Sequence, residues 1–311
     1  MEVRESIRRD ILRLIVWFPL RWIILASPVS LGIAIMRLLG DLHYAFSGGK
    51  KELLGKNLAR MRGVSTDRGK AAREYFRNHY IDRLLIFIFP RLDARRVKRL
   101  VDIEGLENLD NALKEGRGVV LVHGHFGPVH LPLVALARLG YRMKQIGLPS
   151  DEGLSWTGRN VAFRLRLRYE SMMPAEIIKA DSFLRNAFKW LNDNGVIMIT
   201  GDGSGTGTRV GRHKAFEFLG NRVMFPVGPA LLAQKNGSAL IPLFIVPGGK
   251  KPYKIIIERP ITSKLEGEEK AADSTRQFVA RLERYVSMHP GYMHFLDRYS
   301  PGMLIVEEGC L

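Results

Sequence analysis

The chain has 311 residues, of which 46% are hydrophobic and 25% are charged, a composition that excludes disordered and fibrous classes and is typical of a packed globular protein. The single cysteine, Cys310, excludes an internal disulfide and a cysteine-built zinc site, and it favours a reducing compartment. The formal net charge is +17, most of it in residues 1–100, and such a surface attracts anionic lipid, an acidic protein or nucleic acid.

The first apolar segment, residues 11–39, predicts a membrane-associated element. Its longest uncharged run, from Trp22 to Met36, has 15 residues, whereas a spanning helix needs about 20. Pro19 and Pro28 are expected to break or kink a continuous helix. We therefore expect residues 1–45 to form an anchor, either interfacial or marginally spanning, whose basic start stays cytoplasmic. The alternative is a pair of ordinary core helices.

The remaining residues, 46–311, are expected to form one α/β domain. Residues 50–99 read as helical and basic, with an apolar helix face over 80–89 that Pro90 closes. The basic run 95–99 is typical of a solvated helix face, and because no aromatic interleaving accompanies it we expect no nucleic-acid partner. Beyond residue 101 strands alternate with helices, which predicts a central mixed sheet flanked by helices. The expected strands are 119–122, 197–199, 240–246 and 254–257, and the expected helices are 131–139, 227–235 and 272–288.

The loop after the first of these strands carries histidines at a site where chemistry is expected. The sequence runs His123-Gly-His125-Phe-Gly127-Pro-Val-His130, and the proline suits the first turn of a helix. His125 therefore lies between a strand end and a helix start, the edge of α/β sheets at which ligands bind. There an imidazole can act as a general base on a hydroxyl group, although a packing role is the alternative.

The three histidines of this loop also allow a metal-dependent hydrolase as a rival interpretation. Such enzymes use paired histidines at strand ends to hold zinc. They usually add an aspartate close by, which this loop lacks. We therefore expect no metal.

A second loop follows the strand 197–199 and begins with Gly201-Asp202. Its glycines allow the backbone to approach a ligand closely, and Arg209, Arg212 and Lys214 offer cations for phosphate or carboxylate. The nucleotide-binding fingerprints do not fit its sequence. A plain flexible loop is the alternative.

Taken together, these segments resemble the late lipid A biosynthesis (lauroyl/myristoyl) acyltransferases of the lysophospholipid acyltransferase superfamily. The segment from His125 to His130 is similar to the H-x4-[DE] box of that group, and Asp202 with residues 218–242 is similar to its second block. Residues 290–299 are similar to its closing segment. The resemblance covers roughly residues 10–300.

The resemblance implies transfer of a fatty acyl chain from acyl carrier protein or acyl-CoA to a hydroxyl of a lipid or glycolipid, without a cofactor. It places the enzyme on an anionic surface, the cytoplasmic face of a bacterial inner membrane. His125 would be the general base. Backbone N–H groups and an arginine would stabilise the oxyanion, which makes Gly127 and Arg166 or Arg168 the candidates for holding substrate. A basic amphipathic helix at the lipid surface is the alternative for residues 163–168.

One position departs from the pattern, because His130 stands where the box has an acid. In the family that acid orients the catalytic histidine and supports its charged form. Three alternatives remain open. His130 orients His125 with weaker charge support; or another carboxylate, Asp202 or Glu217, takes the role; or the chain has lost acyl transfer and binds lipid without turnover.

Overall fold

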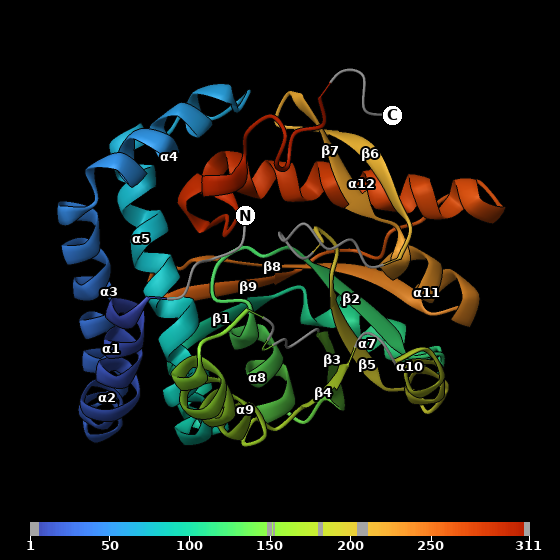
Figure 1. The fold of residues 1–311 in the computed structure, drawn as a ribbon. Coiled ribbons are helices and arrows are strands. Elements are labelled where there is room, and N and C mark those ends of the chain that lie inside the picture. The colour runs from blue at the N-terminus through green and yellow to red at the C-terminus, as the bar shows by residue number, and fades with distance from the viewer. Residues whose placement is uncertain (1–5, 148–150, 152, 180–182, 204–210, 308–311) are drawn as a thin grey trace.

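The computed structural model describes residues 6–147, 151, 153–179, 183–203 and 211–307 of the chain. The described part forms a seven-stranded sheet with helices on both faces, a separate two-stranded hairpin and a group of N-terminal helices along one side (Figure 1). The predicted class, an α/β protein with a central mixed sheet and an apolar helical N-terminus, is confirmed.

The large sheet is mostly parallel. Its strands are β1 Val101–Glu104, β2 Val119–His123, β3 Met143–Gly147, β4 Glu176–Lys179, β5 Val196–Thr200, β8 Ala239–Pro247 and β9 Tyr253–Ile257. They lie in the order β1-β9-β8-β2-β5-β3-β4, and β8 and β9 form the antiparallel pair. β2 pairs in parallel with both β5 and β8, so the carboxyl ends of these three strands meet at one edge.

The central strands are buried on both faces and separate two cores. Val120 and Val122 face α11 (Gly228–Asn236) and α12 (Gly267–Met288), which cover one side of the sheet (Figure 1). Val119 and Leu121 belong to the other core, which contains α8 (His130–Arg138). Strands buried on both sides read as continuous apolar runs, which is why β2, β5 and β8 stand out in the sequence. The other helices of this part are α6 Ala94–Leu100, α7 Leu106–Lys114, α9 Arg164–Glu170 and α10 Phe183–Asn192.

The N-terminal helices stand beside the sheet, and ion pairs join two of them. They are α1 Ile7–Ile15, α2 Arg21–Ala26, α3 Val29–Phe46, α4 Gly48–Arg60 and α5 Arg68–Leu84. The Asp41 carboxylate on α3 accepts from Arg77 and Arg73 on α5, with Nε···Oδ1 distances of 2.7 Å each. These hydrogen bonds hold the pKa of Asp41 well below its usual range.

The two prolines of the N-terminal segment act differently. Pro28 follows the end of α2 and separates it from α3, as predicted. Pro19 lies inside a π-helical turn, Val16–Leu20, through which the chain runs on from α1 into α2. A π-helical turn is a common way for a helix to accommodate an irregular residue, so the helix continues where a break was one of the expected outcomes.

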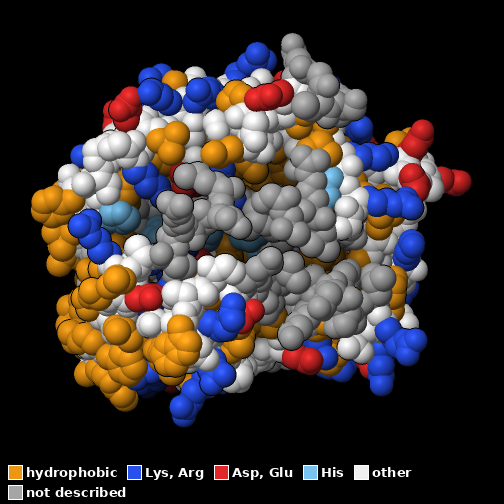
Figure 2. Space-filling view, viewed as in Figure 1, with side chains coloured by type: hydrophobic (Ala, Val, Ile, Leu, Met, Phe, Trp, Pro, Cys, Tyr) orange, Lys and Arg blue, Asp and Glu red, His pale blue; other side chains and the backbone are white. Residues whose placement is uncertain are grey.

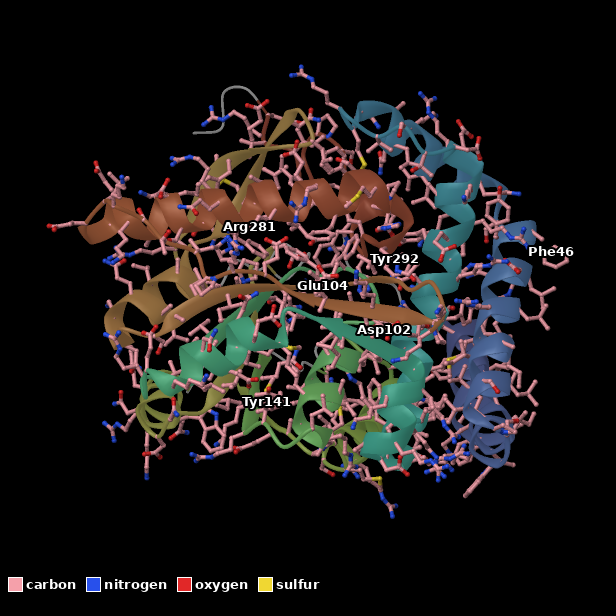
Figure 3. The ribbon with its side chains drawn as sticks, turned by 180° about the vertical axis from the view of Figure 1, so that it is seen from behind. Phe46, Asp102, Glu104, Tyr141, Arg281 and Tyr292 are labelled. Carbon is pink, nitrogen blue, oxygen red and sulfur yellow. The ribbon has the colours of Figure 1, made fainter. Side chains whose placement is uncertain are left out.

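Many apolar side chains of the N-terminal helices remain at the surface. We call this the N-terminal apolar face; it comprises Ile7, Ile11, Leu12, Leu14, Ile15, Phe18, Trp22, Ile23, Leu31, Leu38, Leu42 and Phe46. Apolar side chains gather over α1–α3 in Figure 2, and Phe46 projects away from the end of α3 in Figure 3. Trp17, Ile24 and Met36 point the other way into the second core. Within the described residues, one helix, Val29–Phe46, is long and apolar enough to cross a membrane.

The predicted elements are present, and the structure adds others. β2, β5, β8 and β9 occupy the four predicted strands, and α8, α11 and α12 occupy the predicted helices. The helix expected to reach Pro90 ends at Leu84 and is followed by two short 3-10 turns. β1, β3 and β4 were not predicted, nor was the hairpin of β6 (His213–Phe218) and β7 (Asn221–Pro226) that follows the glycine-rich loop.

Candidate active site

His125 and Asp202 meet at the carboxyl edge of the sheet, beyond its two central strands. In the parallel register of β2 and β5, His123 lies opposite Thr200. The Gly201 N–H donates to the His123 carbonyl at 2.7 Å, which extends this pairing past the strand ends. His125 and Asp202 each follow two positions later, so the register brings the two side chains together.

The Asp202 carboxylate accepts two hydrogen bonds from His125. The backbone N–H of His125 donates to Oδ2 at 2.6 Å, and its ring Nδ1 lies 2.8 Å from Oδ1. Burial lowers the pKa of His125, but the charge and hydrogen bond of Asp202, with the charge of Asp82, raise it by more, so the pKa lies above its ordinary value. Because Nδ1 faces a carboxylate, it holds the ring proton, and Nε2 carries the lone pair when the imidazole is neutral.

Two glycines allow the loops after β2 and β5 to run closely beneath α12. A Cβ atom on Gly124 would lie 2.9 Å from Leu282 Cδ1, and one on Gly201 would lie 2.6 Å from Phe278 Cε1. Neither loop therefore has room for a larger residue. The glycines hold the backbone that carries His125 and Asp202 against the core.

Of the alternatives for supporting His125, the structure brings Asp202 to its ring. His130 lies in the first turn of α8, and within the described residues no group hydrogen-bonds to its imidazole. Burial lowers the pKa of His130, so the ring is neutral at physiological pH. Glu217 is exposed on β6, where it lies opposite Arg222 in the register of the hairpin. The orienting hydrogen bond thus comes from the loop after the neighbouring strand β5, not from the helix.

Two further ionisable side chains of the site were not predicted from the sequence. Asp82, near the end of α5, accepts from the Val129 N–H at 3.1 Å, and His294 lies with its ring centroid 6.2 Å from that of His125. His294 belongs to the segment 290–299 that resembles the closing segment of the family, and this was the available signal. Asp82 is one acid in a charged helix, and nothing in its local sequence distinguishes it.

Gly127 has a backbone that only glycine adopts easily. Its φ is +67°, and a Cβ atom there would lie 2.9 Å from Ile245 Cγ2 and from Tyr292 Cδ1. Its N–H, a candidate donor to substrate, already donates to the Tyr292 carbonyl at 2.9 Å. The residue therefore joins the histidine loop to the segment 290–299.

The two predicted arginines on α9 differ in their relation to the site. Arg166 pairs through Nε with Glu170 Oε1 at 2.6 Å while half of its side chain stays exposed. Its charge also contributes to the lowering of the His130 pKa, which places it within electrostatic range of the histidine loop. Arg168 is exposed, and its charge contributes to none of the shifted histidine pKa values at the site. Of the two arginines, Arg166 is thus the one whose charge acts on a histidine of the loop.

The predicted cations of the second loop lie farther out. Arg212 forms an exposed ion pair with Glu268 of α12, and Lys214 is exposed on β6. Arg209 lies outside the described residues. Within the described residues, therefore, neither Arg212 nor Lys214 contacts His125 or Asp202.

His123 is a buried core histidine. Its Nδ1 lies 3.0 Å from the Gly124 carbonyl oxygen, and burial lowers its pKa to about 4. Across the part of the chain that the structure describes, no group of three His, Cys, Asp or Glu side chains is arranged to hold a metal ion. The rival hydrolase interpretation therefore finds no support in the geometry.

Comparison with known proteins covers both loops of the site. Residues 5–300 match the model of a family described as bacterial lipid A biosynthesis acyltransferase. The chain is similar to the phosphatidylinositol mannoside acyltransferase of Mycobacterium tuberculosis, with 28% identity over 278 residues that cover 83% of this chain and 79% of the relative. It is also similar to the protein of that name from Mycolicibacterium smegmatis, with 27% identity over 218 residues, 65% of this chain and 64% of the relative.

Proposed function

The chain belongs to the bacterial lipid A biosynthesis acyltransferase family, and from this premise we propose that it transfers a fatty acyl chain from an acyl thioester to a hydroxyl group of a glycolipid. The relatives are named for phosphatidylinositol mannoside and the family for lipid A, and both names refer to glycolipids. The donor is a thioester of acyl carrier protein or coenzyme A.

The observation that carries this proposal is the His125–Asp202 pair. The Nδ1···Oδ1 hydrogen bond of 2.8 Å fixes the tautomer in which Nε2 has a free lone pair. That nitrogen removes the proton from the acceptor hydroxyl while the hydroxyl oxygen attacks the thioester carbonyl carbon. When the tetrahedral intermediate collapses, the C–S bond breaks and the imidazolium returns the proton to the leaving thiolate.

Asp202 also stabilises the charged form of the base. Once Nε2 has taken the proton, the imidazolium faces a carboxylate that accepts hydrogen bonds from both its ring and its backbone. The pKa of His125 is raised for the same reason, because Asp202 stabilises the protonated imidazole. Arg166 is our candidate for a cation that attracts the developing oxyanion or an anionic part of the acceptor, because its charge reaches the histidine loop.

We further propose that the N-terminal apolar face lies on the cytoplasmic face of a bacterial inner membrane. Arg21 Cζ lies 4.6 Å from the ring centroid of Trp22, and such a pair suits a headgroup boundary. Residues 1–45 would be the membrane-associated segment, and residues 46–311 the catalytic domain. The net charge of +17 would attract anionic lipid and an acidic carrier protein.

The membrane segment is coupled to the catalytic part through Arg91. Its guanidinium donates to the carbonyls of Leu25, Ser27 and Ile24, at 2.8, 3.0 and 3.2 Å. These hydrogen bonds satisfy carbonyl groups at the end of α2 and place a positive charge at the negative end of the helix. These hydrogen bonds therefore tie the end of α2 to the chain beyond residue 45.

The test is acyl transfer from labelled acyl-CoA and labelled acyl carrier protein to extracted bacterial membrane lipids. Wild type, His125→Ala and the control His213→Ala, a partly exposed histidine on β6 whose Nδ1 contacts the Gly211 carbonyl, run in parallel. We expect a labelled glycolipid from wild type and the control, and none from His125→Ala. Wild type that binds lipid vesicles but yields no labelled lipid from either donor would overturn the proposal in favour of a non-catalytic lipid-binding protein.

A further inference from the structure

Asp82 touches the beginning of the helix that follows the histidine loop. It lies on α5, and its Oδ1 accepts from the backbone N–H of Val129, the residue that caps α8. The carboxylate of another helix thus accepts from the N–H of the N-cap residue, the bond that the acid of a capping box makes within its own helix. Asp82 itself sits in the last turn of α5, where a negative charge opposes the helix dipole. Asp82 therefore stabilises the histidine loop, although its charge is unfavourable at the end of its own helix.

His294 bonds the same loop from the other side. Its backbone N–H donates to the His125 carbonyl at 2.9 Å, and its ring Nε2 lies 2.7 Å from the Gly127 carbonyl. A carbonyl accepts only, so Nε2 holds the ring proton and Nδ1 carries the lone pair of the neutral ring. That Nδ1 lies 3.9 Å from Asp82 Oδ2, a distance at which the carboxylate acts through its charge and not through a direct hydrogen bond.

The segment that carries His294 is itself anchored by two buried amides. Asn57 of α4 donates to the Leu296 carbonyl at 2.8 Å, and Asn78 of α5 donates to the Tyr292 carbonyl at 3.3 Å. Both asparagines are almost completely buried. His294 is therefore held at a fixed place relative to α5, and its distance from Asp82 is set by the fold.

We propose that Asp82 is a positioning residue for His125: its carboxylate fixes the loop 125–129 directly through Val129, and it holds a negative charge 3.9 Å from the ring of His294, which bonds the same loop. This inference rests on the proposed function, because it assigns Asp82 to the base of that same reaction. Asp202 orients the ring of His125, whereas Asp82 fixes the backbone on which the ring stands and adds a second charge.

The charge of Asp82 acts on three imidazoles that face it. It contributes upward to the pKa values of His125, His130 and His294, against burial, which lowers each of them. His125 also faces Asp202. Arg166 and Glu170 of α9 face His130. On the helix of Asp82 itself, Arg83 interacts electrostatically with Asp82, and His79 interacts with Arg83 and His294.

Asp82→Asn tests the proposal, because the amide oxygen can still accept from Val129 while the charge is lost. Without that charge we expect the acid limb of the kcat/KM profile to move to lower pH by about 0.5–1 unit, with kcat reduced and KM unchanged. A purely structural role would lower Tm and reduce activity equally at every pH. The matched control is Asp193→Asn, the same change at an exposed position before β5, at the opposite end of the sheet.

A second measurement separates this inference from the proposed function. The pKa of His125 is read by NMR titration of its Cε1–H resonance, identified with His125→Gln, and this needs no turnover. A lower pKa in Asp82→Asn but not in Asp193→Asn supports the inference even if wild type transfers no acyl chain, an outcome that would refute only the proposed function. An unchanged His125 pKa and an unmoved acid limb in Asp82→Asn would overturn the inference.

His294 provides an independent arm. Glutamine keeps an N–H donor close to the position of Nε2, whereas leucine removes it, so His294→Gln should retain the bond to the Gly127 carbonyl. We expect His294→Leu to lose about tenfold in kcat, as for a displaced catalytic group, and His294→Gln to recover most of it. Equal loss in both variants would show that the hydrogen bond from His294 Nε2 to the Gly127 carbonyl does not position the loop.

Discussion

Replacement of Asp202 by asparagine changes one atom and removes one charge, and its effect follows from the two hydrogen bonds that the carboxylate accepts. The backbone N–H of His125 lies 2.6 Å from Oδ2, and the ring Nδ1 lies 2.8 Å from Oδ1. An asparagine has only one oxygen for these two partners. The backbone N–H cannot become an acceptor, so the amide oxygen faces it and the NH2 group turns toward Nδ1.

That arrangement reverses the tautomer of His125. The NH2 group donates to Nδ1, the ring proton moves to Nε2, and the lone pair needed for the general base is lost. The analogous change in a serine protease triad lowers turnover about 10⁴-fold, and we expect Asp202→Asn to lower kcat by about 10³–10⁴-fold. This loss corresponds to about 4–5.5 kcal/mol of transition-state stabilisation.

The assay is initial-rate acyl transfer at saturating donor and acceptor, with KM measured for each and Tm recorded to show that the variant is folded. Glu217→Gln is the matched control, because that carboxylate is exposed on β6 and takes no part in the site; its rate should equal that of wild type. If Asp202→Asn keeps more than about a tenth of the wild-type kcat while folded, the tautomer argument is wrong.

Three further predictions concern His130, the pH dependence of the wild type and Gly127. His130→Ala should reduce kcat less than about tenfold, since no described residue hydrogen-bonds to that ring; a loss as large as that of His125→Ala would show that His130 supports the base. The kcat/KM of wild type should fall with acidity through a pKa above 6.5, because the pKa of His125 is raised and protonation removes the base; an acid limb below 6.5 would contradict this sign. Gly127→Ala should destabilise the protein by about 1–3 kcal/mol in denaturant unfolding, because φ is +67° and Ile245 lies 2.9 Å from the new Cβ, whereas Gly249→Ala, with open space around it, should not.

The sequence allows the centre of the sheet to be predicted but not its edges. β2, β5 and β8 are buried on both faces, so their apolar runs are legible without knowledge of their neighbours. β3 contains Lys144 and Gln145, and β4 has only four residues. The hairpin β6–β7 alternates charged and apolar side chains directly after a glycine-rich loop. Such segments form strands because they pair with neighbouring strands, and those strands can be distant in the sequence.

Some residues of the site can be identified from the sequence, but the contacts between them cannot. His125 and Asp202 are each identified by position, since each follows a buried strand. Their pairing depends on β5 lying beside β2 although β3 and β4 intervene in the chain, and the order of strands in the sheet is not a property of either loop. Asp82 and His294 reach the site from α5 and from the segment after α12. Only the packed structure brings these distant residues to one loop.

The same geometry gives a physical reason why a histidine is acceptable at position 130. Nδ1 of His125 already has a carboxylate partner in Asp202, so an acid on α8 would not be needed to orient it. Asp82 and Glu170 both face position 130, and Arg166 is the cation that contributes there. A further carboxylate at this position would be repelled by these two acids. A neutral imidazole in the first turn of α8 avoids that repulsion. Although His130 departs from the H-x4-[DE] pattern, the ring of His125 keeps a carboxylate partner in Asp202.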